Sequence, residues 1–375
     1  MKDIINTAKQ QVEYYRLLND SPVLLDDRLI FYNSSQMINH EYLHYPFMDH
    51  IYIHHNLSRE GIYERIYWLD GMWKQAESTV WKHRKEICGI SEESRGCKFY
   101  TTHYRKNTLL NPDKFYIEEN ILYICRDQLV GDRKQMVWDK IKEFRPEWLQ
   151  MEAAEALLLL EEDEGRLALD GLQIKYIEIL NSLRTDLCAA LQQRFGCPVR
   201  RSYRSSLFGW IAFENEKSEM ELLTENISVH YEKEMPLFST RINEVMPVFF
   251  YRTGYFLSAK ADTWIITQEE TSGSPLITLD HGSRICGDLF KRPIEFMNER
   301  VGRILNQVQI TQERAGQFII HIGMNSSYWG WRDEVKKLFL ENLFIPELVR
   351  AEYKFFFEKD MLKDKRPFFI NAAEI

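Results

Sequence analysis

Apolar residues recur at helical spacing in several stretches of this 375-residue chain. The spacing predicts helices over residues 1–20, 70–92, 137–144, 172–191 and 331–342. Short runs rich in β-branched and aromatic residues, bounded by Gly, Asn or Pro, predict strands between these helices. The strands are expected at 51–55, 98–102, 115–117, 121–125, 199–203, 227–232, 264–267 and 275–279. This mixture of helices and strands predicts the α/β fold class.

The pattern changes after residue 291. A hairpin is expected from 307–310 and 317–322, and it is followed by the helix at 331–342 and a last strand at 349–357. This β-β-α-β order is typical of a small α+β domain. A chain of 375 residues also exceeds the usual size of a single domain, so two domains are expected.

Composition narrows the class of protein. The chain is 45% hydrophobic and 28% charged, as in ordinary globular proteins, and its net charge of −8 argues against broad nucleic-acid binding. Six scattered cysteines without a Cys-x-x-Cys pair give no zinc site and no disulfide framework, so no metal site is predicted. No apolar signal core and no apolar run of membrane-spanning length is present, and we expect a cytoplasmic protein without a membrane partner.

One stretch combines a buried strand with a polar turn: Asn-Glu-Val-Met-Pro-Val-Phe-Phe-Tyr-Arg-Thr-Gly-Tyr at 243–255. Pro247 can begin a strand at 248–251, and Thr253-Gly254 would end it. On pattern alone this is a core strand followed by an ordinary turn. The same letters resemble the segment Asn-x-x-Met-Pro-Leu-Ile-Arg-Tyr-Arg-Thr-Gly-Asp of adenylate-forming enzymes of the phenylacetate–coenzyme A ligase type. In that family the closing Asp binds the ribose of ATP, and here Tyr255 stands in its place.

The resemblance extends to a second motif. Tyr203, Ser205 and Gly209 match the family's Tyr-x-Ser-x-Glu-x-Gly, in which Tyr and Ser lie near the adenine and Glu binds Mg²⁺. Leu207 occupies the Glu position, and an aliphatic side chain cannot ligate a cation that takes oxygen ligands. The alternative is a buried turn between two strands. The resemblance thus implies Tyr203, Ser205 and Arg252 as nucleotide-binding residues, with the Mg²⁺ carboxylate missing.

Three further positions follow the family's order. Arg284 and Asp288 resemble the Gly-Arg-x-x-Asp hinge, in which Arg contacts the ribose–phosphate region and Asp is the pivot between domains. Lys365 is the best match to the catalytic Lys near the end of the family's sequence. A polar inter-domain turn and a surface lysine are the alternatives. The family's glycine-rich phosphate loop corresponds to 56–61, where only Ser58 and Gly61 retain its properties.

The resemblance implies an adenylate-forming fold with a large N-terminal α/β domain at 1–288 and a small C-terminal α+β domain at 289–375. It implies ATP- and Mg²⁺-dependent activation of a small carboxylic acid and its transfer to the thiol of coenzyme A or of a carrier protein. Because the phosphate-loop glycines, the Mg²⁺ carboxylate and the ribose carboxylate are all replaced, two alternatives stay open. One is a degenerate pseudo-ligase that serves a protein partner or binds an acyl ligand. The other is an ATP-independent acyltransferase.

Overall fold

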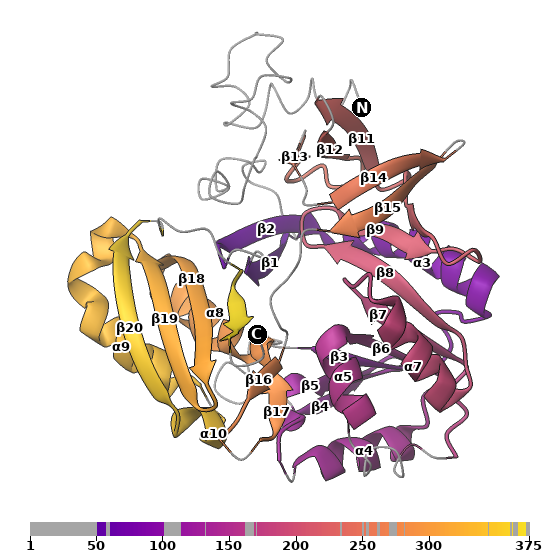
Figure 1. Ribbon diagram of the computed structural model, residues 1–375. Coiled ribbons are helices and arrows are strands. Elements are labelled where there is room, and N and C mark those ends of the chain that lie inside the picture. The colour runs from indigo at the N-terminus through magenta and orange to yellow at the C-terminus, as the bar shows by residue number, and fades with distance from the viewer. Residues whose placement is uncertain are drawn as a thin grey trace, which may run out of the picture. The chain divides into compact units, whose positions relative to one another are not determined.

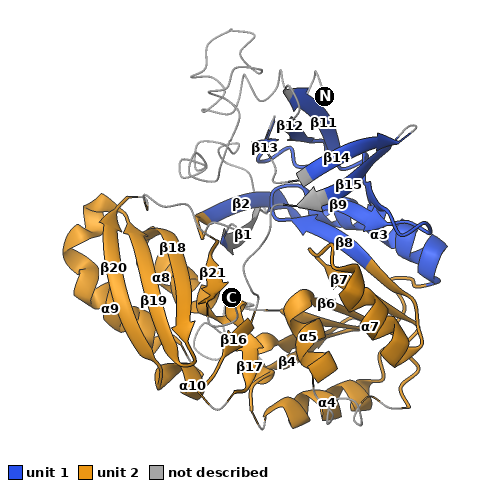
Figure 2. Ribbon diagram, viewed as in Figure 1, with its two compact units in different colours: residues 1–58, 64–89, 201–271 blue, residues 59–63, 90–200, 272–375 orange. Residues whose placement is uncertain are grey.

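The computed structural model describes most of the chain from residue 51 onward. The described residues are 51–57, 61–100, 114–131, 133–161, 169, 171–232, 235–249, 251–252, 255–260, 263–269, 276–280, 282–343, 345–360, 362 and 367–372. The predicted helix at 1–20 lies outside these ranges. The chain divides into two compact units, each built from separated segments (Figure 2). Unit 1 holds residues 1–58, 64–89 and 201–271, and unit 2 holds residues 59–63, 90–200 and 272–375.

The described residues of unit 1 are mainly β-structure with one long helix (Figure 1). Five of its strands are neighbours in the order β14 (Tyr255–Lys260), β15 (Thr263–Glu269), β10 (Met220–Leu222), β9 (Gly209–Glu214) and β8 (Val199–Ser205). A second sheet has the order β11 (Ile227–Glu232), β12 (Met235–Thr240) and β13 (Tyr251–Arg252). The pair β1 (Ile51–Leu57) and β2 (Tyr63–Leu69) leads into the helix α3 (Asp70–Cys88).

The helix α3 agrees with the prediction for 70–92 and ends where the sequence indicates. Gly89 adopts the left-handed conformation, with φ of 67°, and its N–H donates to the carbonyls of Arg84 and Lys85. A glycine in this conformation is the usual way to satisfy the last carbonyls of a helix. The helix buries Ala76 and Val80 against the sheet, and the Arg84 guanidinium lies over the Trp210 ring at 5.0 Å.

Unit 2 contains a mostly parallel sheet in the order β7 (Tyr176–Leu180), β6 (Trp148–Glu152), β3 (Gly96–Tyr100), β5 (Ile121–Cys125) and β4 (Phe115–Glu118). Only β4 is antiparallel to its neighbour, and it forms the predicted hairpin with β5. The described helices of this part are α4 (Arg133–Phe144), α5 (Ala153–Glu161) and α7 (Thr185–Phe195), with the short 3₁₀ helix η3 (Arg126–Gln128) after β5. All five side chains of β7 are buried, as expected for a parallel strand covered on both faces.

The predicted helix at 172–191 is wrong in its first half. Residues 176–180 form β7, and the helix α7 begins only at Thr185. The run Tyr-Ile-Glu-Ile-Leu is short and apolar, and such a run is compatible with either a helix or a strand. Here it forms a strand, because it pairs with β6 along its full length. Asn181 takes a positive φ of 54° directly after β7, so the chain turns there instead of continuing.

The remainder of unit 2 confirms the predicted β-β-α-β order. The strands β18 (Leu305–Arg314) and β19 (Gln317–Met324) form the hairpin, and α9 (Arg332–Glu341) and β20 (Glu352–Lys359) follow. With β21 (Phe369–Asn371) the sheet has the order β20-β19-β18-β21. Its other elements are the pair β16 (Leu276–Thr278) and β17 (Arg284–Cys286), the 3₁₀ helices η4 (Gly287–Phe290) and η5 (Ser326–Trp331), and the helices α8 (Lys291–Arg300) and α10 (Pro346–Val349). The α/β fold class is therefore confirmed, while the predicted boundary at 288/289 stays a prediction.

Candidate functional site

The turn between β8 and β9 in unit 1 carries the Tyr-x-Ser-x-Leu-x-Gly motif. Tyr203 is only 1% exposed and lies opposite Ala212 of β9. The Ser205 hydroxyl accepts a hydrogen bond from the backbone N–H of Leu207 at 3.1 Å, which closes a tight turn. Leu207 is itself 5% exposed. Tyr203 and Ser205 therefore lie at the end of β8 and Leu207 in the turn that follows, and the Tyr203 and Leu207 side chains are buried in the core.

Packing around this turn fixes its conformation. The Ser206 carbonyl accepts a hydrogen bond from the Trp68 indole at 2.8 Å. Gly209 has a φ of 71°, and a Cβ atom there would lie 2.8 Å from the Ala76 side chain. A glycine is needed because both the conformation and the close approach of α3 exclude a larger residue. The motif's glycine thus has a packing role in this chain.

In the segment at 243–255, Asn243 and residues 245–249 are buried, but they do not form a strand. The prediction of a strand at 248–251 is wrong for residues 248 and 249, while Tyr251 belongs to β13 and pairs with β12; residue 250 lies outside the described residues. Asn243 explains the difference: its side chain accepts from the Met246 N–H at 3.1 Å and donates to the Tyr67 carbonyl at 3.0 Å. This side chain replaces the hydrogen bonds that a strand partner would supply. Only the backbone of Arg252 is described.

In unit 2, charged residues converge at the carboxyl ends of the parallel strands, where ligands commonly bind in α/β sheets. The buried Arg126 directly follows β5, and Glu152 is the last residue of β6. The Arg126 guanidinium is 3.2 Å from the Glu152 carboxylate and 2.9 Å from that of Asp288, and it also pairs with Glu155. Lys291 contacts the same Asp288 oxygen, Oδ2, at 3.0 Å. We call these five residues the Arg126 cluster.

The electrostatics of the Arg126 cluster follow from burial opposed by ion pairing. Burial raises the pKa of Glu155, and the charge of Arg126 only partly offsets this. Burial alone would also raise the pKa of Asp288, but Lys291 and Arg126 together hold it below the ordinary Asp value. Two cations thus face three carboxylates. Because both cations are already neutralised, the Arg126 cluster does not offer free positive charge to a phosphate.

The predicted hinge residues both lie in unit 2. Asp288 belongs to η4 and is held within the Arg126 cluster. Arg284, on β17, forms an ion pair with Glu161 at the end of α5. The predicted role of Asp288 as a pivot and that of Arg284 as a ribose–phosphate contact remain predictions.

The two remaining predicted segments are only partly described. Residues 58–60 of the expected phosphate-loop segment and the predicted catalytic Lys365 lie outside the described residues. Gly61 is described, and its backbone pairs with β18, since its carbonyl accepts from the Val308 N–H at 2.8 Å. Gly61 has a φ of 74°, and a Cβ atom there would overlap the Val308 carbonyl. This close approach accounts for the glycine without a phosphate.

The Mg²⁺ that the family resemblance implies does not fit these residues. Leu207 is buried and apolar at the metal-ligand position, so it supplies no oxygen. Across the described ranges, no group of three or more His, Cys, Asp and Glu side chains could hold a metal ion. The pattern His-Glu-Tyr-Leu-His at 40–44 has the His-Glu-x-x-His spacing of zinc enzymes. It lies outside the described residues.

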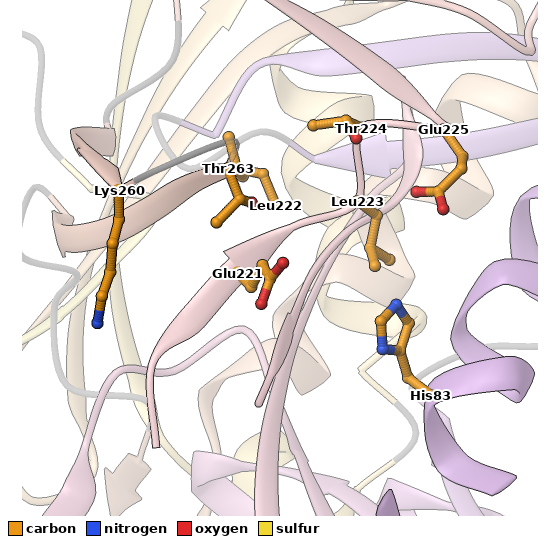
Figure 3. Close-up of a pocket in the computed structure, with 8 residues that line it drawn as sticks. All are labelled: His83, Glu221, Leu222, Leu223, Thr224, Glu225, Lys260 and Thr263. Carbon is orange, nitrogen blue, oxygen red and sulfur yellow. The ribbon is translucent and has the colours of Figure 1, made fainter. Parts of the chain in front are cut away.

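Unit 1 also has a surface hollow of about 340 Å³, apart from the predicted site residues (Figure 3). It is lined by His83, Glu221, Leu222, Leu223, Thr224, Glu225, Lys260 and Thr263. His83 stacks on Phe213 at 5.6 Å, and Lys260 is paired with Glu219. Lys260, and Glu221 through Asn215, are thus engaged by the protein itself. None of the helices in the described part of the chain has the length and apolar run that a bilayer span requires.

Comparison with known proteins defines the fold. No protein-family model matches the sequence, and no curated protein matches it either. Among solved structures, the chain is similar to 2-hydroxyisobutyryl-CoA ligase in complex with 2-HIB-AMP and CoA in the thioesterification state. The TM-score is 0.57 at 12% identity, over 99% of this chain and 89% of the ligase chain.

Two other structures of the same ligase give similar values. In the postadenylation state with 2-HIB-AMP the TM-score is 0.55 at 11% identity, over 100% of this chain and 88% of the ligase chain. In an open conformation with 2-HIB-AMP and CoA it is 0.50 at 11% identity, over 98% and 89% of the two chains. The chain therefore has the fold of the adenylate-forming ligases, and the predicted resemblance is confirmed at the level of the fold.

Proposed function

We propose that this protein is a non-adenylating relative of the carboxylic acid–CoA ligases, which binds an acyl ligand without activating it with ATP·Mg²⁺. The observation that carries the proposal is the burial of Leu207. It takes the place of the family's metal-binding carboxylate, and its side chain is 5% exposed in the turn between β8 and β9. A residue packed in this way contributes to the core and not to a metal shell.

The neighbouring nucleotide positions support the same proposal. Tyr203 is 1% exposed, so its ring has no open face on which an adenine could stack. The Ser205 hydroxyl holds the turn by accepting from Leu207 N–H. Arg284 pairs with the Glu161 carboxylate, which would compete with a phosphate for the guanidinium. Each contact stabilises the protein itself, and each would have to break before ATP could use the same group.

The acyl ligand is inferred from the fold. The similar ligase structures hold 2-HIB-AMP and, in two of the three cases, CoA. If the nucleotide site is altered, the sites for the acyl group and for the thiol compound are those that can still bind a ligand in such a fold. We therefore expect a carboxylic acid or its CoA or carrier-protein thioester as the ligand of this chain.

A second candidate is a working acid–thiol ligase with an altered ATP site. It is favoured by the extent of the likeness, which spans 99–100% of the chain against two adenylate-bound structures. In this case Tyr203, Ser205, Arg252 and Arg284 would contact the nucleotide and Lys365 would assist adenylation. The two candidates differ in whether ATP binds at all.

Thermal unfolding with ligands distinguishes them. A ligand that binds only the native state raises the free energy of unfolding by about 2.7 kcal/mol at a hundredfold excess over its Kd. We expect no rise in Tm with millimolar ATP·Mg²⁺ and a dose-dependent rise with CoA or an acyl-CoA. A rise with ATP·Mg²⁺, together with carboxylate-dependent pyrophosphate exchange that Lys365→Ala abolishes, would establish the ligase instead.

A substitution at Leu207 directly tests whether this buried position can hold a metal-binding carboxylate. Leu207→Glu restores the family's carboxylate but places a charge in the core, so we expect it to lower the free energy of unfolding by about 3–5 kcal/mol. Leu207→Met, which keeps an apolar side chain of similar size, should cost less than about 1.5 kcal/mol. If Leu207→Glu were as stable as Leu207→Met and gained ATP·Mg²⁺ binding, the position would be an open metal site and the proposal would be wrong.

A further inference from the structure

The strand β20 forms one edge of its four-stranded sheet in unit 2. It pairs in parallel with β19 on one side, over all eight residues from Glu352 to Lys359, and the described part of the chain holds no strand on its other side (Figure 1). The strand contains neither proline nor a register shift. Long, regular edge strands of this kind are templates for pairing with another chain.

The backbone hydrogen bonds show which residues face the outer edge. The N–H of Glu352 donates to the Gly316 carbonyl, and the N–H of Asp360 donates to the Met324 carbonyl. Because N–H groups alternate in direction along a strand, even-numbered residues direct their backbone groups to β19. The odd-numbered residues 353, 355, 357 and 359 therefore present theirs to the outer edge.

The side chains of β20 divide into two faces. Tyr353 and Phe355 lie on the helix-covered face, where Phe355 contacts Phe339 of α9 at 5.7 Å between ring centroids. Lys354, Phe356 and Glu358 lie on the opposite face. Phe356 is 50% exposed there and stacks on His321 of β19 at 5.1 Å. A half-exposed aromatic ring at the centre of an edge strand is a suitable anchor for a partner strand.

We propose that β20 pairs in antiparallel fashion with β20 of a second copy of this chain, with Phe356 on the two-fold axis. Directly opposite residues of an antiparallel pair must both face the partner or both face away. Odd residues must therefore pair with odd ones. With Phe356 opposite itself, the hydrogen-bonded pairs are Phe355 with Phe357 and Tyr353 with Lys359.

Charge complementarity selects this register. It places Lys354 opposite Glu358 twice, once on each side of the axis, so that opposite charges face one another across the strands. Shifting the axis to residue 355 would place Glu352 opposite Glu358, which are like charges. Shifting it to residue 357 would pair Lys354 with Asp360, but Asp360 has left the strand with a φ of 62°. The paired sheets would form one eight-stranded sheet with both sets of helices on the same face.

Reciprocal charge reversal tests the proposal in the full-length protein by sedimentation velocity at micromolar concentrations. We expect a reversible dimer whose association weakens by about ten- to a hundredfold in Lys354→Glu, and equally in Glu358→Lys, because like charges then face one another. An equimolar mixture of the two variants should dimerise again, since both cross-strand pairs are then opposite in charge. Lys82→Glu, an exposed change on α3, is the control and should leave association unchanged.

Disulfide trapping gives a second measurement. Residue 356 would lie opposite itself in a pair whose Cα atoms are about 4.5 Å apart, within the range of a disulfide. Phe356→Cys should form a covalent dimer under mild oxidation, whereas Lys354→Cys should not crosslink to itself but should do so when mixed with Glu358→Cys. A monomeric wild-type protein at all concentrations, open-ended oligomers, a bound foreign peptide, or no rescue by mixing would each overturn the proposal. It does not depend on the proposed function.

Discussion

At the scale of single residues, the buried charges of the Arg126 cluster are the feature with the largest energetic consequence. Arg126 is 4% exposed and contacts three carboxylates from β6, α5 and η4. The buried ion pairs taken together can leave the free energy of unfolding unchanged, because the cost of removing their charges from water opposes the attraction between them. Removing only the cation is different, since it leaves the buried Glu155 carboxylate without its partner and weakens the pairing of Glu152 and Asp288.

We therefore expect Arg126→Met to lower the free energy of unfolding by about 3–5 kcal/mol. Arg184→Met is the matched control: Arg184 pairs with Asp186 at 2.5 Å on the surface, and this loss should cost less than about 1 kcal/mol. Urea unfolding of both variants measures the difference. Equal effects in the two variants would contradict the structural role assigned to Arg126.

The same comparison has a defined dependence on pH. The pKa of Asp288 is lowered in the folded protein, so its contribution to stability is present above the ordinary Asp value and is lost as pH falls through its folded pKa. Arg126 is one of the two cations responsible for this lowering. The stability gap between wild type and Arg126→Met should therefore narrow below about pH 4, and a gap that widens in acid would exclude this account.

At the scale of elements, local contacts decide several conformations that the family resemblance leaves open. The segment before β13 is fixed by the Asn243 side chain, and the segment before β2 is fixed by the pairing of Gly61 with β18. Both are positions where the sequence resembles a ligand-binding motif. In both, the structure supplies a partner from the protein itself.

Gly61→Ala separates the structural explanation of this glycine from a phosphate-binding one. Gly89 has a similar positive φ, and a Cβ atom there would meet nothing within 4 Å. We expect Gly89→Ala to cost about 1–2 kcal/mol for its backbone conformation, and Gly61→Ala to cost a further 1–3 kcal/mol, roughly, for overlap with β18. Denaturant titration of both variants gives the difference. A Gly61→Ala variant that lost nucleotide binding but kept its stability would favour a phosphate loop.

At the scale of the whole molecule, each compact unit is assembled from separated segments. The predicted boundary at 288/289 cuts through unit 2. Contacts on either side of this boundary include Asp127 with Arg292 at 3.4 Å and Thr278 with Gln312 at 2.9 Å. Asn371 donates to the Leu276 carbonyl at 3.1 Å in the same way. These contacts tie residues 289–375 to the rest of unit 2.

We accordingly expect a chain shortened to residues 1–288 to unfold at a clearly lower temperature than the full-length protein, because unit 2 loses these partners. Differential scanning calorimetry of both chains measures this. If the shortened chain retained one of the full-length transitions at an unchanged temperature, then residues 1–288 would be an independent domain, as the sequence predicts.

Much of the fold could be predicted because strong local patterns agree with the pairing. The hairpin of β18 and β19 and the helix α3 with its terminal Gly89 are of this kind. The strand β7 was missed because a five-residue apolar run fits either a strand or a helix, and its pairing with β6 decides. The Arg126 cluster could not be predicted, since its members are far apart in the sequence. The one local signal was a charged residue directly after a buried strand.

The pairing of Gly61 with Val308 also bears on how the protein is made. The two partners are far apart in the chain, so on the ribosome Gly61 emerges long before the strand that receives it. Residues of unit 1 up to 271 are complete before β18 exists, whereas unit 2 must wait for β18 and β21. Unit 2 therefore cannot complete its folding until its last strands have been synthesised. If translation stalls before residue 305, we expect the early part of unit 2 to stay partly folded and to need chaperones.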